Sequence, residues 1–415
     1  MLVAIAWVAK RSATLHRTAS KCLTLGVALS LYGVARFVRR LGARRGNRLP
    51  RRVVHVSPYY FSDDSIIGGG ERYAMGLAEA MANHVETRFV SFGAARASFR
   101  QGCLGVEIYP NDKWVRGLVS IRFLRELLHA DVVHCHQYRV LPTSLAILAG
   151  AALRKRVFVT DHRGTGHHFT ETSKRIRLPL STYVDGFLAV SAYSVEAMPT
   201  KFKKVHIIYG GVDERFTGGP LAAERERKVL FVGRLIPHKG INYLIEAVED
   251  DVQLDVIGRI YDDEYFALLK GLAQDKKVRI ITDASDDGII HAYRSALVMV
   301  LPSVDVDVFG KPMDAPELLG LVLLESMACG TPVICTNAGA MPEVVEDGVT
   351  GFVVPSRDPA ALRERINYLL ANPDVALRMG QNGRRKILQD FTWDAVARRC
   401  LAVYGDERCP TQAKP

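Results

Sequence analysis

The fold class is indicated by residues 53–92 of this 415-residue chain, which read VVHVSPYYFSDDSIIGGGERYAMGLAEAMANHVETRFVSF. The apolar run at 53–59 predicts a strand, residues 71–83 predict an amphipathic helix, and residues 87–92 predict a second strand. Two strands joined by a helix-length segment form the repeating unit of a parallel sheet. The stretch therefore predicts an α/β protein.

The same alternation continues to the C-terminus, interrupted once by a polar segment rich in glycine and charge at 213–228, which predicts a linker. We expect two Rossmann-like doubly wound domains facing each other across a cleft, with ligands bound beyond the carboxyl ends of the strands. The expected divisions are an N-terminal segment, a first domain, the linker, a second domain, and a C-terminal helix with a tail: 1–52, 53–212, 213–228, 229–388 and 389–415. Strands in the second domain are expected at 228–232, 254–257, 278–281, 298–301, 332–335 and 351–354.

The positive charge is concentrated in one segment. Residues 1–52 contain 12 of the 55 Lys and Arg and no Asp or Glu, which leaves 43 basic against 44 acidic residues in the rest of the chain. The main body is therefore not expected to bind nucleic acid. The seven cysteines include no C-x-x-C pair, which argues against a disulfide scaffold and indicates a reducing compartment.

Residues 22–35 form an uncharged and mostly apolar run. As a helix it would measure about 21 Å, short of a hydrocarbon core of about 30 Å. We expect this segment to lie on a membrane, with its arginines at anionic headgroups, and the protein to be cytoplasmic and peripherally attached to the inner face of the cell membrane. The alternatives are a disordered basic leader or a wrongly assigned start codon.

Two glycine-punctuated loops are candidate phosphate sites. Gly69 and Gly70 come between the first strand and its helix, where a ligand can approach the backbone and the helix N-terminus. A tight turn explains them equally well. Arg234 and Lys239 lie five residues apart after the first strand of the second domain, so the pair can clamp a diphosphate. The alternative is a pair of solvated surface cations, which the two residues taken in isolation favour. Their position at the edge of the expected cleft favours the binding role.

Two glutamates flank an apolar run in ELLGLVLLE, residues 317–325. If Gly320 begins a helix, the amides of Leu321 and Val322 are free to bind a phosphate. Glu317 would then lie on the preceding loop and Glu325 in the second helical turn, one contacting a sugar and the other ribose hydroxyls. The alternative is a capping glutamate and a solvated one.

Histidines are clustered in the first domain. Residues 131–136 predict a strand, on which His134 and His136 share a face, with His136 nearer the carboxyl end. His162 and Arg163 follow the next predicted strand, at 157–161. A metal hydrolase is the alternative that these histidines suggest, but no Asp or Glu stands at a convincing ligand spacing, so no metal site is predicted.

Together these motifs resemble the family 4 retaining glycosyltransferases of the glycosyltransferase-B fold, also called glycosyl transferases group 1. The specific part is ELLGLVLLESMACGTPVI at 317–334, and the resemblance extends over about 53–404, including VLFVGRLIPHKG at 229–240 and DVVHCHQ at 131–137. Two features depart from the family pattern. Gly210 stands where the family often has Asn, and the stretch 305–316 is longer than usual.

The resemblance implies an N-terminal acceptor domain, a C-terminal nucleotide-sugar domain and a final helix that crosses back to the first. It assigns the reacting centre to Glu317 and His136, and the acceptor to His162 and Arg163. The donor would be held by Gly69, Gly70, Arg234, Lys239, Gly320, Leu321, Val322 and Glu325.

The expected reaction is retaining transfer of a hexose from a nucleotide-diphosphate sugar to a glycan or lipid-linked acceptor, in cell-envelope polysaccharide or glycolipid synthesis. Neither a metal nor another cofactor is expected. The alternatives are a nucleotide-sugar epimerase of the same fold and a non-catalytic protein that binds sugar nucleotides.

Overall fold

The computed structural model describes residues 26–40, 48–58, 69–93, 95–110, 121–138, 140–162, 178–198, 200–219, 224–313 and 316–405. The chain divides into two compact units. The N-terminal unit consists of the described residues within Met1–Ala189, Pro199–His206 and Ala397–Cys409. The C-terminal unit consists of those within Val190–Met198 and Ile207–Val396. The helix α14 (Trp393–Tyr404) begins in the second unit and ends in the first.

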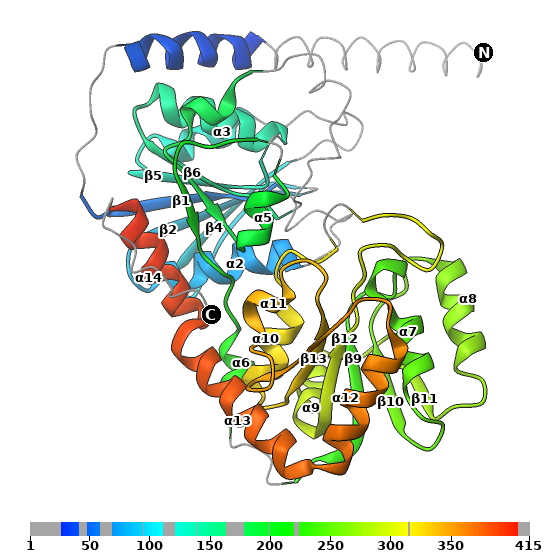
Figure 1. Ribbon diagram of the computed structural model, residues 1–415. Helices are drawn as coiled ribbons and strands as arrows, with labels where there is room; N and C mark the ends of the chain where they lie inside the picture. The colour runs from blue at the N-terminus through cyan, green and yellow to red at the C-terminus, as the bar shows by residue number, and fades with distance from the viewer. Residues whose placement is uncertain are drawn as a thin grey trace, which may run out of the picture. The chain divides into compact units, whose positions relative to one another are not determined.

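An eight-stranded sheet forms the centre of the N-terminal unit, in the order β3-β4-β2-β1-β5-β6-β7-β8 (Figure 1). Strand β1 pairs in parallel with β2 and β5, which places the carboxyl ends of these strands at one edge of the sheet. The bounds are β1 (Arg52–Val56), β2 (Glu86–Gly93), β3 (Ala97–Gln101), β4 (Leu104–Pro110), β5 (Val132–His136), β6 (Arg156–Thr160), β7 (Gly186–Ala189) and β8 (Val205–Ile207).

Two of the described helices pack on this sheet through their apolar side chains. The helix α2 (Gly69–Ala82) packs on β2 and β4, and α3 (Leu141–Ala152) packs on β5 and β6. Two short elements complete the region, η1 (Ile121–Leu127) and η2 (Leu180–Tyr183), while α5 (Ala192–Glu196) belongs to the C-terminal unit. The pattern at 115–129 predicts an amphipathic helix, whereas its described part is the 3-10 helix η1.

The C-terminal unit contains a six-stranded parallel sheet in the order β11-β10-β9-β12-β13-β14. Its strands are β9 (Glu226–Val232), β10 (Gln253–Ile257), β11 (Val278–Ile281), β12 (Ala296–Leu301), β13 (Val333–Thr336) and β14 (Gly351–Val354). All six predicted strands are confirmed to within two residues at each end. The helices that accompany them are α6 (Glu214–Thr217), η3 (Pro237–Lys239), α7 (Ile241–Ala247), α8 (Asp263–Leu272), α9 (Asp286–Ser295), α10 (Leu321–Ala328), α11 (Met341–Val344), α12 (Pro359–Ala371) and α13 (Pro373–Asp390).

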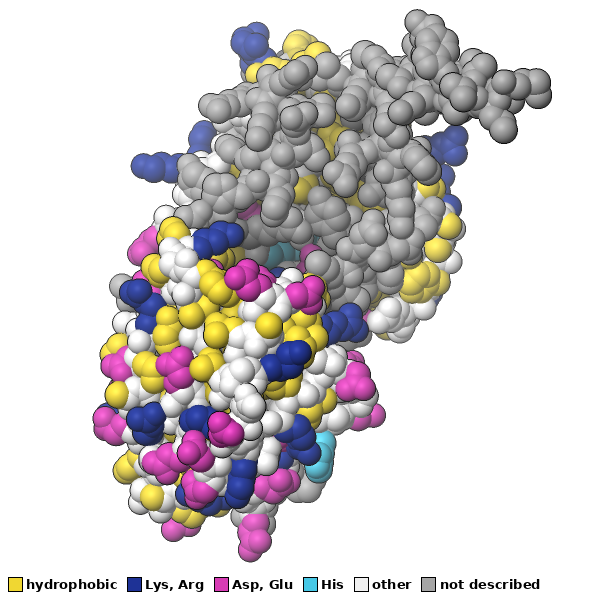
Figure 2. All heavy atoms as spheres, turned by 90° about the vertical axis from the view of Figure 1, so that its right-hand side faces the viewer, with side chains coloured by type: hydrophobic (Ala, Val, Ile, Leu, Met, Phe, Trp, Pro, Cys, Tyr) yellow, Lys and Arg dark blue, Asp and Glu magenta, His cyan; other side chains and the backbone are white. Residues whose placement is uncertain are grey.

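Surface charge on the C-terminal unit is mixed in sign. On the face of this unit that Figure 2 turns toward the viewer, Lys and Arg side chains are interspersed with Asp and Glu. Opposite charges at such spacing cancel beyond about 10 Å at moderate salt. The described side chains on this face therefore present no extended basic surface for a polyanion.

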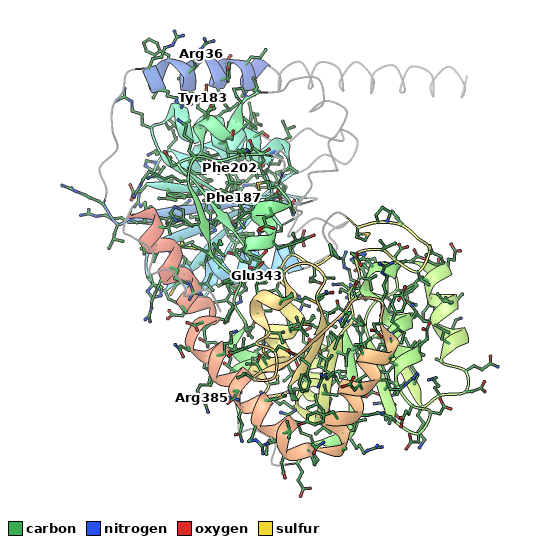
Figure 3. The ribbon with its side chains drawn as sticks, in the orientation of Figure 1. Arg36, Tyr183, Phe187, Phe202, Glu343 and Arg385 are labelled. Atoms are coloured by element: carbon green, nitrogen blue, oxygen red, sulfur yellow. The ribbon has the colours of Figure 1, made fainter. Side chains whose placement is uncertain are left out.

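Residues 26–40 form a helix that packs on η2 within the N-terminal unit (Figure 3). The rings of Tyr32 and Tyr183 meet edge to face at 5.9 Å, and the Arg39 guanidinium donates to the carbonyl of Thr182 at 2.8 Å. Ala35 of the same helix is buried. Among the described residues, no helix is both long and apolar enough to cross a bilayer.

Candidate functional site

The loop that follows β9 carries the two predicted phosphate-binding cations. It ends at Gly240, whose backbone is left-handed with φ of 65°. A Cβ atom at this position would lie 2.1 Å from the carbonyl oxygen of Pro302, just after β12. Only glycine permits both the left-handed turn and this close approach. Lys239, immediately before Gly240, is thereby held beside the carboxyl end of β12.

The ammonium of Lys239 forms an ion pair with Glu317 Oε2, and both side chains are largely buried. The Ser303 hydroxyl lies 3.4 Å from the same oxygen. The backbone of Glu317 is fixed as well, because its carbonyl accepts the N–H of Ala340 at 2.9 Å. Two predicted site residues that are 78 positions apart in the chain are thus in direct contact.

The helix α10 begins directly after this pair. Gly320 is its N-cap, with φ of 81°, and the helix extends over Leu321–Ala328, as predicted. The N–H groups of Leu321 and Val322 belong to the first turn, where helix geometry provides no intrahelical acceptor. The positive end of the helix dipole and these two backbone N–H donors therefore lie three to five residues after Glu317 in the chain.

Glu325 lies in the second turn of α10, and its side chain is only 8% exposed. The Tyr293 hydroxyl of α9 donates to Glu325 Oε2 at 3.0 Å. This carboxylate is therefore anchored at a buried position, which contradicts its interpretation as a solvated glutamate. Tyr293 was not among the predicted site residues, because nothing in the local pattern of α9 distinguishes a core tyrosine from a carboxylate partner.

His238 lies between the two cations in the loop. Burial, followed by the positive charges of Lys239 and Arg234, lowers the pKa of His238 to about 4. The imidazole is therefore neutral near pH 7. The positive charge of the loop comes from Lys239, which is buried, and Arg234, which is exposed.

In the N-terminal unit, Gly69 and Gly70 open α2. A Cβ atom on Gly70 would lie 2.7 Å from the Cβ of His162. Gly70 thus makes room for the His162 side chain, a requirement that the sequence pattern did not reveal. Arg163, predicted to bind the acceptor, lies outside the described residues.

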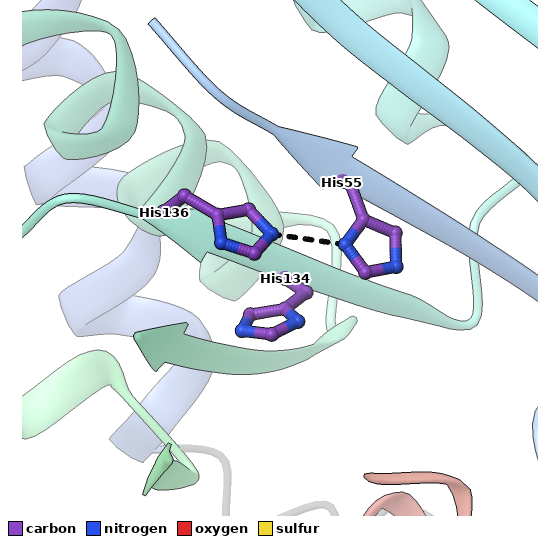
Figure 4. A group of neighbouring side chains, drawn as sticks. All are labelled: His55, His134 and His136. Carbon is purple, nitrogen blue, oxygen red and sulfur yellow. Dashed lines mark hydrogen bonds between the residues drawn. The ribbon is translucent and has the colours of Figure 1, made fainter. Parts of the chain in front are cut away.

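A histidine cluster forms beneath the carboxyl edge of this sheet (Figure 4). His55 of β1 is the register partner of His134 of β5, so both side chains project from the same face, and His136 follows two residues later. All three are fully buried. His136, predicted at the reacting centre, contacts His55 through one ring nitrogen and His162 through the other.

Burial keeps these imidazoles neutral. It lowers the pKa of His55 to about 3. Burial, and then repulsion from neighbouring histidines, lowers the pKa values of His134 and His136 well below 6.5. A neutral imidazole has one N–H donor and one lone-pair acceptor, so the hydrogen bonds of each ring define its tautomer.

His55, His134 and His136 also have the composition of a metal centre, with ligand atoms within 4.8 Å of one another. All six ring nitrogens nevertheless have partners. His134 contacts the Tyr404 hydroxyl at 2.7 Å and the Thr160 hydroxyl at 2.8 Å, and His55 and His136 contact each other at 3.0 Å. Metal ligation requires an unprotonated nitrogen from each ring at about 2.0–2.1 Å, which would break several of these contacts. The geometry favours a hydrogen-bonded cluster.

Glu343 is a further residue whose role the sequence did not reveal. Its carboxylate accepts the N–H groups of Ala192 and Tyr193, each at 2.7 Å, and the Tyr209 hydroxyl at 3.0 Å. This contact holds the start of α5 within the C-terminal unit (Figure 3). Burial and this carboxylate raise the pKa of Tyr209.

Comparison with known proteins accounts for both units. Residues 67–216 match the model for Glycosyltransferase Family 4, and residues 213–386 match the model for Glycosyl transferases group 1. The chain belongs to glycosyltransferase family 4. The second match contains every C-terminal site residue described above, and the first contains Gly69, Gly70, His136 and His162.

Curated relatives of this family 4 glycosyltransferase use several substrates. Alpha-maltose-1-phosphate synthase of Mycobacterium tuberculosis is 31% identical over 266 residues, which cover 54% of this chain and 66% of the synthase. Phosphatidyl-myo-inositol mannosyltransferase of Mycobacterium leprae is 27% identical over 377 residues, which cover 85% of this chain and 96% of that enzyme.

The fold also matches solved structures. Anabaena HepE, solved with UDP and glucose, superposes with a TM-score of 0.66 at 17% identity, covering 86% of this chain and all of HepE. The protein thus has the two α/β domains of the glycosyltransferase-B fold. That it is a glycosyltransferase follows from the two family models that match its sequence.

Proposed function

We propose that the protein transfers a hexosyl group, with retention of anomeric configuration, from a nucleotide-diphosphate sugar to a glycan or lipid-linked acceptor. The proposal depends on one observation: the buried ion pair of Lys239 and Glu317 lies next to the N-terminus of α10. A cation, a carboxylate and free amides are what a departing diphosphate and the adjacent sugar require.

In the proposed mechanism, Lys239, Arg234 and the amides of Leu321 and Val322 bind the diphosphate and stabilise its charge as it departs. Glu317 faces the donor sugar, and the departing phosphate accepts the proton of the attacking hydroxyl. Glu325 accepts hydrogen bonds from the ribose hydroxyls while Tyr293 holds it in place. These groups supply the positive charge that a metal would otherwise provide, so we propose that no metal is required.

The substrate class is supported by the names of relatives. The mannosyltransferase of M. leprae transfers a hexose and is named for a phosphatidylinositol acceptor, which is a lipid. An acceptor of this kind suits an enzyme with a basic, apolar N-terminal segment. We propose a lipid-linked or envelope-glycan acceptor on the same grounds.

The test is a panel of radiolabelled nucleotide sugars, each incubated with the full chain, with and without membrane extract and with and without EDTA. We expect the radiolabel of one donor to be transferred to the extract, and to the same extent with and without EDTA. Conversion of a donor without extract would indicate an epimerase, and binding without turnover would indicate a non-catalytic protein. Loss of activity in EDTA would contradict the metal-independent mechanism.

We further propose that helix 26–40 rests on an anionic membrane surface. Its inner face packs on η2, while its outer face leaves Leu29, Val34 and Phe37 exposed at 47%, 49% and 61%. Arg36, which is labelled in Figure 3, and Arg40 are exposed on the same helix. Apolar side chains next to basic ones favour partition into a negatively charged interface.

Replacing both Leu29 and Phe37 by Glu should lower partition into phosphatidylglycerol vesicles by at least about 10-fold, because it removes two exposed apolar side chains that would enter the interface and adds two charges that the anionic lipid repels. Vesicle co-sedimentation measures this. Leu388→Glu is the matched control, since Leu388 is 47% exposed on α13. Equal partition of all three proteins would contradict membrane contact through this helix.

A further inference from the structure

A continuous line of hydrogen bonds connects four side chains of the N-terminal unit. The sulfur of Met81 lies 3.4 Å from His55 Nε2, and His55 Nδ1 lies 3.0 Å from His136 Nε2. His136 Nδ1 in turn lies 3.3 Å from His162 Nε2. Met81 is on α2, while the three histidines come from the ends of β1, β5 and the segment after β6.

The line has a direction because one of its ends can only accept. A thioether sulfur has no hydrogen to donate, so His55 forms a hydrogen bond with Met81 only when its proton is on Nε2, the tautomer that we assign to it. His55 Nδ1 is then a lone pair, which requires His136 to donate from Nε2. His136 Nδ1 is therefore also a lone pair, and it accepts from His162 Nε2.

The hydrogen bonds along this line require the imidazoles of His55 and His136 to be neutral, and burial keeps them neutral. His55 and His136 are fully buried, and their pKa values are lowered far below neutrality. His162 is only partly buried, so the line runs from the core of the unit toward its surface. The lone pair of His136 faces the outer end.

We propose that Met81 and His55 are positioning residues that hold His136 in its Nε2–H tautomer, so that its Nδ1 presents an acceptor toward the substrate side. This inference rests on the proposed function and on the family resemblance, which assigns His136 to the reacting centre. A sugar hydroxyl that displaces His162 from Nδ1 would donate its hydrogen bond there. The opposite tautomer would offer an N–H at that point and would orient the hydroxyl the wrong way.

The arrangement separates two roles within one cluster. His134 is as deeply buried as His55 and adjoins both other rings, but its own nitrogens contact Thr160 and Tyr404. It is not a member of the line. Its replacement should cost folding stability and leave the tautomer of His136 unchanged, which makes it the matched control.

The direct test is long-range ¹H–¹⁵N correlation NMR of the full chain labelled at histidine, at pH 7.5 without substrate. We expect His55 and His136 each to carry the proton on Nε2. In Met81→Leu, which keeps the volume but removes the sulfur acceptor, both rings should become tautomer mixtures. A proton on His136 Nδ1 in the wild type, or an unchanged tautomer in Met81→Leu, would overturn the inference.

Kinetics of the labelled-donor reaction supply the second measurement. His55→Leu removes the acceptor for His136 Nε2–H and should lower kcat by about 10-fold or more with little change in the KM for the donor. His55→Asn places an amide oxygen near the position of Nδ1 and should restore much of kcat. His134→Leu should retain kcat within about threefold even if its melting temperature falls as far as that of His55→Leu.

Equal loss of kcat in His55→Leu, His55→Asn and His134→Leu would show a purely structural role and overturn the inference. The tautomers are measured without any substrate, so a failure to find a donor contradicts only the proposed function. A reversed tautomer in an enzyme that transfers sugar contradicts only this inference.

Discussion

Glu317→Gln should lower kcat by about 10²–10³-fold, the range seen when one transition-state electrostatic contact is removed, while the dissociation constant of the donor changes less than about threefold. Glutamine keeps the shape and one hydrogen-bonding oxygen but removes the negative charge next to the developing positive charge at the anomeric carbon. Because that charge develops only during reaction, binding of the ground state is affected little. Single-turnover kinetics and donor titration by calorimetry measure the two quantities separately.

The ion pair with Lys239 allows a second interpretation of Glu317, which predicts a different effect of the same substitution. If Glu317 only neutralises Lys239, its replacement frees the ammonium for the diphosphate. Donor affinity would then rise and kcat would stay near the wild-type value, and this outcome would contradict a catalytic role.

Asp255→Asn is the control for ion-pair loss. Asp255 is 1% exposed and pairs with Lys228 and Arg279 in the same unit. Breaking this pair should reduce stability and leave kcat unchanged.

Acid should unfold the N-terminal unit before the C-terminal unit. The pKa of His55 is lowered to about 3, and those of His134 and His136 are lowered well below 6.5, so an unfolded chain binds more protons than the folded one between these values and pH 6.5. The stability that depends on these neutral rings is complete above about pH 6.5 and is lost as the pH falls below it. Within that window, each of these histidines lowers the free energy of unfolding by about 1.4 kcal/mol for each unit by which the pH falls.

Differential scanning calorimetry between pH 7.5 and 5 measures this loss. Among the described residues, the C-terminal unit has one histidine with a lowered pKa, His238, at about 4. Its transition should therefore move less than that of the N-terminal unit. His134→Leu removes one titrating group and should flatten the pH dependence of the first transition relative to its own value at pH 7.5. Parallel movement of the two transitions would contradict this account.

The sequence predicted the C-terminal unit more accurately than the N-terminal one. Several of its strands, such as β12 and β13, are wholly buried and are short apolar runs in the sequence, so local pattern and final structure agree. In the N-terminal unit, β3 is almost wholly exposed and has no alternating pattern, and α3 is apolar on nearly all sides. Neither was predicted, because β3 is neither an apolar run nor an alternating one, and the apolar stretch of α3 shows no helical period.

Local sequence patterns were sufficient to predict the α/β class, the strands of the second sheet, the start of α10 at Gly320 and the candidate residues of a diphosphate site. The contacts between distant residues became visible only in the folded chain: Lys239 with Glu317, Tyr293 with Glu325, and His55 with a histidine 81 residues away. Strand register and close backbone approach, such as that of Gly240 to Pro302, are set by packing between distant segments, and such packing leaves no signal in a local pattern.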